Sequence, residues 1–173
     1  MTMAAPDPTV HSAYRFGALA LLIAAGSILI ALGFEHLGGL APCELCLEQR
    51  YAYYAGVPLL FLALVALSAG QPRAAMIVFC IVALAFLANA VLGVYHAGAE
   101  WQFWPGPVAC SGSQAITTNA GSMLDALQNT KVVRCDVAAW RLAGISFAGW
   151  NVVASLLIVW LSIRATFEAL HAR

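Results

Sequence analysis

Residues 16–34 read FGALALLIAAGSILIALGF and contain no charged side chain. A helix needs about 20 apolar residues to cross the hydrocarbon core of a bilayer, so this stretch predicts a membrane span. The composition agrees, because 62% of the 173 residues are hydrophobic and only 9% are charged. Such a chain has too few charges to cover a soluble globule of its size. We therefore predict a membrane protein.

Three further uncharged runs predict three further spans. With the first run included, the expected spans cover about residues 16–34, 51–71, 74–95 and 142–163. Four spans return the chain to the side on which it began, so we predict an all-α protein, an antiparallel bundle of four transmembrane helices that forms a single domain over residues 1–173. The two loops at the opposite end then cover about residues 35–50 and 96–141.

The first run also has to be compared with a cleaved signal peptide. It is long for the apolar region of such a peptide, and residues 35–39, EHLGG, lack a convincing small-x-small cleavage site. We therefore expect the first run to stay in the protein as a membrane span.

The long second loop contains a predicted short amphipathic helix. Apolar side chains recur at helical spacing, with polar side chains between them; these apolar residues are Ile116, Ala120, Met123, Leu124 and Leu127. Such a helix can lie on the membrane surface or pack against the rest of the loop, and the pattern does not separate these two positions.

The stretch PCELCLEQR, residues 42–50, joins the first two expected spans and contains a CxxC pair. The thiols of Cys43 and Cys46 can close into a small, reducible ring. If the next helix includes Cys46, then Arg50 lies one turn further along on the same face. A nearby cation and the positive end of a helix both lower the pKa of a thiol. The pattern therefore favours redox chemistry.

Four of the five cysteines lie in the two loops of one side: Cys43, Cys46, Cys110 and Cys135. An even number of cysteines on one side is typical of a compartment in which disulfides persist. The basic residues are equally divided between the two sides, so the cysteines decide the orientation. We expect both termini in the cytoplasm and both loops in an oxidising space. Cys80, alone in the third span, is expected to be an inert apolar side chain.

Zinc binding and structural disulfides are the alternatives to redox chemistry. Cys110 and Cys135 have 24 residues between them and form no second CxxC, so the spacing fits a zinc ribbon poorly, and we expect no metal. A CxxC disulfide also contributes little to stability, because the stabilisation by a disulfide grows with the length of the loop that it closes.

The zero net charge and the lack of a basic cluster give no indication of a nucleic-acid partner. A non-catalytic membrane protein with structural or metal-bound cysteines stays as the runner-up.

Taken together, these features resemble the bacterial disulfide bond formation protein B (DsbB) family. The resemblance rests on Pro42–Cys46 with Arg50, on Tyr95–His96, on Cys110 within 107–112, on Arg134–Asp136, and on Trp140, Gly144 and Trp150–Asn151. These motifs span about residues 42–151, and the four-span layout extends the likeness to nearly the whole chain. The vitamin K epoxide reductase family does similar chemistry on a helical bundle, but the loop motifs fit it less well.

The resemblance implies a membrane thiol:quinone oxidoreductase of the bacterial inner membrane. It would reoxidise a periplasmic thioredoxin-fold oxidase (DsbA-like) through two redox-active disulfides, Cys43/Cys46 and Cys110/Cys135. By this analogy Cys110 is attacked by the oxidase, and Cys135 then passes electrons to Cys43. Both loops are then periplasmic.

The resemblance also implies a quinone site, supplied from the membrane quinone pool with ubiquinone or menaquinone. Cys46 faces the quinone ring, Arg50 stabilises the charged state, and His96 lies near the same ring. The protein is expected to be a monomer. Glu44 stands between the two cysteines, and its carboxylate is expected to raise the pKa of a neighbouring thiol and to oppose Arg50.

Overall fold

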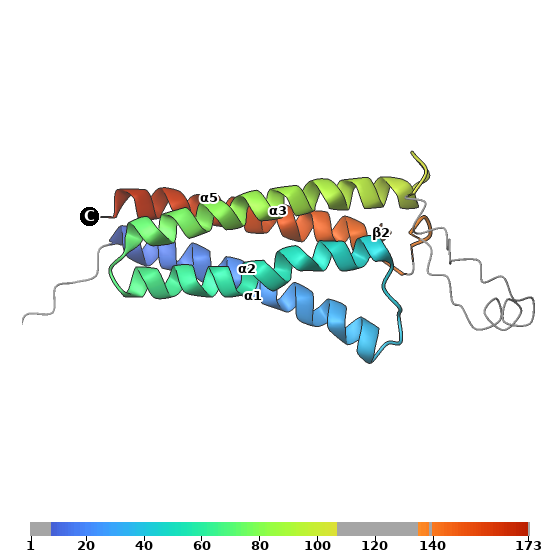
Figure 1. Ribbon diagram of the computed structural model, residues 1–173, viewed down its shortest axis with the longest axis horizontal. Coiled ribbons are helices and arrows are strands. Elements are labelled where there is room, and N and C mark those ends of the chain that lie inside the picture. The colour runs from blue at the N-terminus through green and yellow to red at the C-terminus, as the bar shows by residue number, and fades with distance from the viewer. Residues whose placement is uncertain (1–7, 107–134, 139, 173) are drawn as a thin grey trace, which may run out of the picture.

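The computed structural model describes residues 8–106, 135–138 and 140–172, and the structural statements below concern these residues. Four long helices make up most of this part (Figure 1): α1 (Pro8–His36), α2 (Glu44–Ser68), α3 (Pro72–Glu100) and α5 (Phe147–His171). Each of them is long and apolar enough to cross a membrane. The prediction of a helical protein with four spans is confirmed. The predicted amphipathic helix at 116–127 lies outside the described residues.

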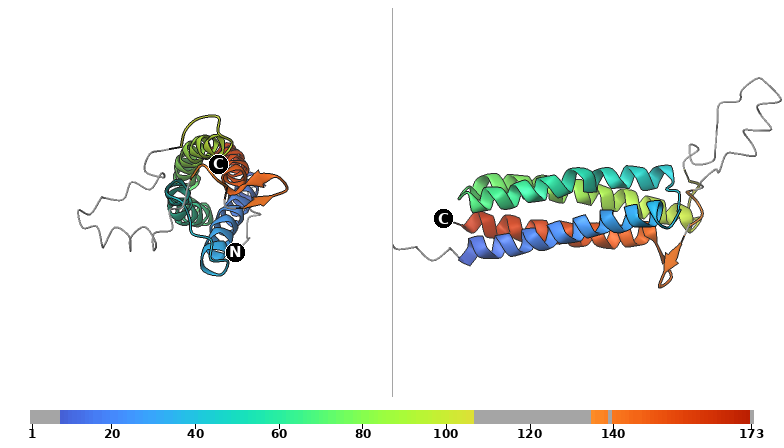
Figure 2. Two further views of the ribbon diagram at one scale, coloured as in Figure 1. Left: turned by 90° about the vertical axis from the view of Figure 1, so that its right-hand side faces the viewer. Right: turned by 90° about the horizontal axis from the view of Figure 1, so that it is seen from below.

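The four helices form an antiparallel bundle in which each helix packs against two neighbours. α1 and α3 each pack against both α2 and α5, so the helices form a ring when viewed along the bundle (Figure 2). The turn between α2 and α3 lies at the same end as the start of α1 and the end of α5 (Figure 1). We call the opposite end, where α1 connects to α2, the loop end. The outer surface carries large exposed apolar side chains, among them Leu22, Leu29, Leu84, Val91 and Leu156.

Helix α1 packs through small side chains. Its buried residues are three or four positions apart and almost all small: Ala13, Gly17, Ala20, Ala24 and Ile28. Small residues let helix backbones approach closely, which favours helix association within a bilayer. The fully buried ring of Phe79 from α3 fills the space at Gly17, where an added Cβ would lie 2.7 Å from Phe79 Cζ. The sequence of α1 therefore sets how closely it approaches the rest of the bundle.

Two short strands precede α5 and pair antiparallel: β1 (Arg141–Leu142) and β2 (Ile145–Ser146). Their turn contains Gly144 with a φ of 82°, a conformation that glycine adopts without steric cost. The hydroxyl of Ser146 then caps α5 by accepting a hydrogen bond from a backbone N–H of its first turn. The apolar pattern suggested a span from residue 142, because residues 142–146 of the hairpin are uncharged like the start of the helix that follows.

Helix α3 is longer than the apolar run suggested, since it continues past Tyr95 to Glu100. Trp104 then folds back on the helix. Its indole Nε1 donates a hydrogen bond to the Tyr95 carbonyl oxygen at 2.9 Å, and its ring lies against Gly98, where no side chain would fit. The extra turn places His96 and Glu100 on a rigid helix rather than in the loop expected from 96 onward.

The close approach at Gly17 leads to a prediction about stability. Gly17→Leu is expected to destabilise the folded bundle by about 1–3 kcal/mol, because the new side chain overpacks the site against a buried ring. Gly26→Leu on the same helix is the matched control, since an added Cβ at Gly26 meets no atom within 4 Å. Thermal unfolding of both variants in detergent checks this. Equal melting temperatures for the two variants would contradict the packing described here.

Candidate functional site

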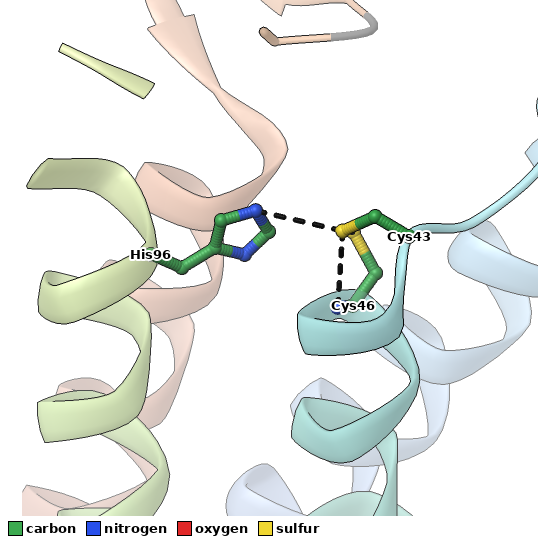
Figure 3. A group of neighbouring side chains, drawn as sticks. All are labelled: Cys43, Cys46 and His96. Atoms are coloured by element: carbon green, nitrogen blue, oxygen red, sulfur yellow. Dashed lines mark hydrogen bonds between the residues drawn. The ribbon is translucent and has the colours of Figure 1, made fainter. Parts of the chain in front are cut away.

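The CxxC pair lies at the first turn of α2. Cys43 is the N-cap of this helix, and its sulfur accepts a hydrogen bond from the backbone N–H of Cys46 at 3.3 Å. Both cysteines are free thiols, with their sulfur atoms 2.7 Å apart (Figure 3). An S–S bond is about 2.05 Å long, so a small shift would bring the sulfurs to bonding distance. The partial positive charge at the helix N-terminus favours an anion at this position.

His96 from α3 faces this pair (Figure 3). Its Nε2 atom lies 3.6 Å from Cys43 Sγ and 3.7 Å from a carboxylate oxygen of Glu100, one turn along the same helix. The other ring nitrogen, Nδ1, lies 2.8 Å from the side-chain amide nitrogen of Gln49. His96 is only 2% exposed, so its ring is held in place by neighbours rather than by water.

The surroundings of Cys43 disfavour its thiolate. Contact with the Cys46 thiol and then burial raise the pKa of Cys43, and the Glu100 carboxylate acts in the same direction. Glu44, the carboxylate that the sequence suggested for this effect, is exposed. The acidic residue that raises the Cys43 pKa comes from α3, and sequence spacing alone does not reveal it.

A cavity of about 410 Å³ opens at the loop end beside the CxxC pair. Its volume falls within the range of small-molecule sites, about 300–1,000 Å³. Most of its lining is apolar, and the rings of Phe34, Trp140 and Phe147 form one wall, with neighbouring centroids 5.0–5.3 Å apart. The three residues expected at a quinone site all line this cavity: Cys46, Arg50 and His96.

Arg50 has a partner that sequence analysis did not identify. Its guanidinium forms an ion pair with the carboxylate of Glu35, in the last turn of α1. Both residues line the cavity, and the Arg50 side chain is 12% exposed. A charge in such a place needs a counter-charge. Glu35 therefore holds Arg50 in position and offsets part of its charge.

A network of polar side chains runs from His96 into the bundle. Asn151 of α5 is its centre: its amide donates to Gln49 Oε1 at 2.7 Å, and its Oδ1 accepts from Tyr53 at 2.7 Å and from Asn89 at 3.2 Å. Asn89 also donates to Ser155 Oγ at 3.0 Å. Polar residues inside membrane spans are costly and are often functional. That signal could have identified Asn89 and Asn151 from the sequence.

Cys135 belongs to the same end of the bundle. It is disulfide-bonded and packs in a small buried cluster with Cys43 and Leu45. The structure thus brings Cys135 together with the CxxC pair, whereas Cys110 lies outside the described residues. Cys80 is a free, exposed thiol and is not among the residues that line the cavity.

Comparison with known proteins adds to this geometry. Residues 14–165 match the family described as Disulfide bond formation protein DsbB. The chain belongs to this family. Two relatives named Disulfide bond formation protein B are similar to it. The one from Marinobacter nauticus is 31% identical and covers 86% of this chain and 88% of its own length. The one from Aromatoleum aromaticum is 30% identical, and the match covers 82% of this chain and 84% of the relative's own length. No solved structure matches the chain.

Membership of the DsbB family confirms the resemblance seen in the sequence. The chain is a multi-pass membrane protein of disulfide bond formation, and the family name indicates a disulfide oxidoreductase. The thiols at the loop end are the groups in the described structure that suit such a reaction.

The polar network gives a prediction about Asn151. Asn151→Leu is expected to cost about 1–3 kcal/mol of stability per polar group left unpaired, because Gln49 and Tyr53 lose their partner inside the bundle. Ser162→Ala on the same helix is the matched control: among the described residues its hydroxyl is buried without a hydrogen-bond partner, so its removal is expected to be nearly neutral. Denaturation of both variants in detergent measures the difference. A neutral Asn151→Leu variant would contradict the role of the network.

Proposed function

We propose that this protein is a thiol:quinone oxidoreductase of the bacterial inner membrane. It takes two electrons from a reduced periplasmic thioredoxin-fold oxidase (DsbA-like) and transfers them to quinone, which sustains disulfide bond formation. One observation supports this most strongly: Cys46 lines an apolar cavity with Arg50 and His96, while Cys43 packs against Cys135. The CxxC pair thus has a thiol-exchange partner on one side and a ligand cavity on the other.

The proposed relay begins with a Cys110/Cys135 disulfide and a Cys43/Cys46 disulfide. The oxidase thiolate attacks Cys110, which forms a mixed disulfide and releases the Cys135 thiolate. Cys135 attacks Cys43, and Cys46 leaves as a thiolate. Each step needs a thiolate, a good leaving thiol and access. The packing of Cys135 against Cys43 and Leu45 is consistent with the second step.

The second thiol of the oxidase then completes the exchange. It attacks the mixed disulfide and releases the oxidised oxidase together with the Cys110 thiolate. Cys110 attacks Cys135, which reforms their disulfide and frees Cys43. The products are an oxidised partner and a reduced CxxC pair. The cysteine bonding in the described structure, with Cys43 and Cys46 free and Cys135 disulfide-bonded, is compatible with these products.

Reoxidation of the CxxC pair takes place at the cavity. A bound quinone accepts two electrons and two protons. Cys46 supplies electrons from the cavity wall, and the Arg50 guanidinium stabilises negative charge at this wall, where the dielectric is low. His96 Nε2, 3.6 Å from Cys43 Sγ, is placed to take up the Cys43 proton as the S–S bond reforms. The aromatic wall keeps water away from the thiolate.

The remaining features of the proposal concern location. The loop end faces the periplasm, and both termini and the turn at Arg73 face the cytoplasm. Cys110 and the CxxC pair are then exposed to an oxidising compartment and to the partner oxidase. The apolar lining is compatible with ubiquinone and with menaquinone. The protein acts as a monomer, because one chain contains the whole proposed relay.

Serine variants of the CxxC pair test the proposal. Cys43→Ser and Cys46→Ser are each expected to abolish quinone reduction by the purified protein on addition of a reduced thioredoxin-fold oxidase, since neither variant can form the ring. Quinone absorbance gives the rate. Cys80→Ala is the control and is expected to keep the full rate. Normal turnover by either serine variant would rule out the relay.

Arg50 provides a second test at the cavity. Arg50→Met is expected to lower kcat/KM for quinone by about tenfold or more, equivalent to about 1.4 kcal/mol of transition-state stabilisation. Methionine keeps an unbranched apolar side chain, so the loss reports charge rather than packing. A quinone titration at fixed partner concentration measures the effect, with the folded fraction in detergent as a check.

The matched control for charge is Arg73→Met, at the opposite end of the bundle, which is expected to leave quinone kinetics unchanged. Glu35→Gln keeps the Arg50 cation and is expected to affect kcat/KM less than Arg50→Met does. If folded Arg50→Met and Arg73→Met show the same kinetics, Arg50 has no part in quinone use.

A further inference from the structure

The reduced CxxC pair lies against two further potential metal ligands on α3. Cys43 Sγ, Cys46 Sγ and a ring nitrogen of His96 all lie within 4.8 Å of one another (Figure 3). A carboxylate oxygen of Glu100 is 3.7 Å from His96 Nε2. We propose that Cys43, Cys46 and His96 form a Zn²⁺ site that exists only when both cysteines are thiols, with Glu100 beside it.

The distances suit a tetrahedral ion. Zinc bonds of about 2.3 Å to sulfur and about 2.05 Å to nitrogen place the two ligand atoms about 3.6 Å apart, and Cys43 Sγ to His96 Nε2 is 3.6 Å. The two sulfurs have to move from 2.7 Å to about 3.8 Å apart, which small rotations of two thiol side chains can supply.

Glu100 adds an independent observation. Its side chain is only 6% exposed, and its Oε2 atom is buried without a hydrogen-bond partner in the described part of the chain. A buried carboxylate oxygen without a partner is costly. A divalent cation bound beside His96 would offset the negative charge of this carboxylate.

His96 is held with its Nε2 atom toward the thiols. Nε2 lies 3.6 Å from Cys43 Sγ, and Nδ1, on the other side of the ring, lies 2.8 Å from the side-chain nitrogen of Gln49. The ring therefore needs no rotation to present Nε2 to an ion beside the two sulfurs. We expected no metal from the sequence because only the spacing of the four loop cysteines was compared with zinc sites. In the structure His96 of α3 joins the two cysteines at the start of α2.

Zinc binding depends on the redox state of the pair. Binding releases two thiol protons and transfers no electron, because Zn²⁺ is redox-inert. A Cys43–Cys46 disulfide removes both thiolate ligands, so the oxidised protein loses the site. One consequence rests on the proposed function. Bound zinc holds Cys46 in its reduced form and blocks electron transfer from Cys46 to a quinone in the cavity. The site would thus make turnover sensitive to zinc.

Direct metal binding tests this inference. Full-length protein carrying Cys110→Ala and Cys135→Ala keeps the CxxC pair and removes the other loop thiols. It is reduced, desalted without oxygen and titrated with Zn²⁺ against a chromophoric chelator. We expect one zinc per chain, and at least about 100-fold weaker binding after oxidation of the pair. Cobalt in place of zinc is expected to show thiolate charge-transfer bands and the visible bands of a tetrahedral ion. Equal zinc binding by the reduced and oxidised forms would overturn the site.

Ligand variants separate this site from adventitious thiol binding. His96→Ala is expected to weaken zinc binding by more than about 100-fold, and the isosteric Glu100→Gln by about tenfold or more. Glu48→Gln is the control, because Glu48 is an exposed acid on α2, and it is expected to bind zinc normally. Normal binding by Glu100→Gln would remove Glu100 from the site, and normal binding by folded His96→Ala would overturn the proposal.

Quinone reduction by the wild-type protein is then measured separately, with and without zinc. Inhibition by zinc that EDTA reverses supports the site and its consequence. Normal quinone reduction together with a lack of zinc binding would overturn this inference and leave the proposed function intact. Zinc binding by a protein that shows no quinone reduction in zinc-free buffer would overturn the proposed function and leave the metal site intact.

Discussion

A polar side chain inside a membrane bundle has to find its partners within the bundle, and this constraint organises the loop end. Asn151 contacts Gln49, Tyr53 and Asn89, so it joins α5 to α2 and α3. Gln49 in turn contacts the His96 ring. The position of His96 against the CxxC pair therefore follows from hydrogen bonds that begin in the membrane-spanning part of the protein. The site is as rigid as the bundle that carries it.

The two cysteines of the CxxC pair have different surroundings. Cys43 is buried, packs against Cys135 and has a raised pKa, whereas Cys46 borders the cavity. The helix start explains this asymmetry: Cys43 is the N-cap, and its sulfur lies over the first turn and faces His96, whereas Cys46 begins the helical face that Arg50 shares. The proposed relay needs this asymmetry, because thiol exchange and quinone reduction have to take place on opposite sides of one small ring.

The sequence predicted the fold better than it predicted the site. Spans and family could be identified because uncharged runs of about 20 residues and the CxxC motif are local signals. The hairpin before α5 and the last turn of α3 were missed, since residues 142–146 of the hairpin are uncharged and His96 and Glu100 looked like loop residues. Glu35 and Gln49 were missed as site residues for another reason: their contacts join different helices, and no spacing within one segment records them. Glu100 lies one turn from His96 on α3 and was missed because that turn was expected to be part of the loop.

The ion pair of Arg50 and Glu35 shows how a charge can be kept ready in an apolar cavity. An unpaired guanidinium there would lose its hydration without compensation, so the helix end of α1 supplies a carboxylate. The pair has no net charge, and its dipole is fixed because the two residues lie on packed helices. In the proposed relay, a negative charge that develops at Cys46 would meet a cation that is already desolvated and in place, so little reorganisation would be needed. Glu35 weakens the electric field of Arg50 at the cavity. The ion pair therefore provides the cavity with a cation in a fixed position rather than with a full unit of positive charge.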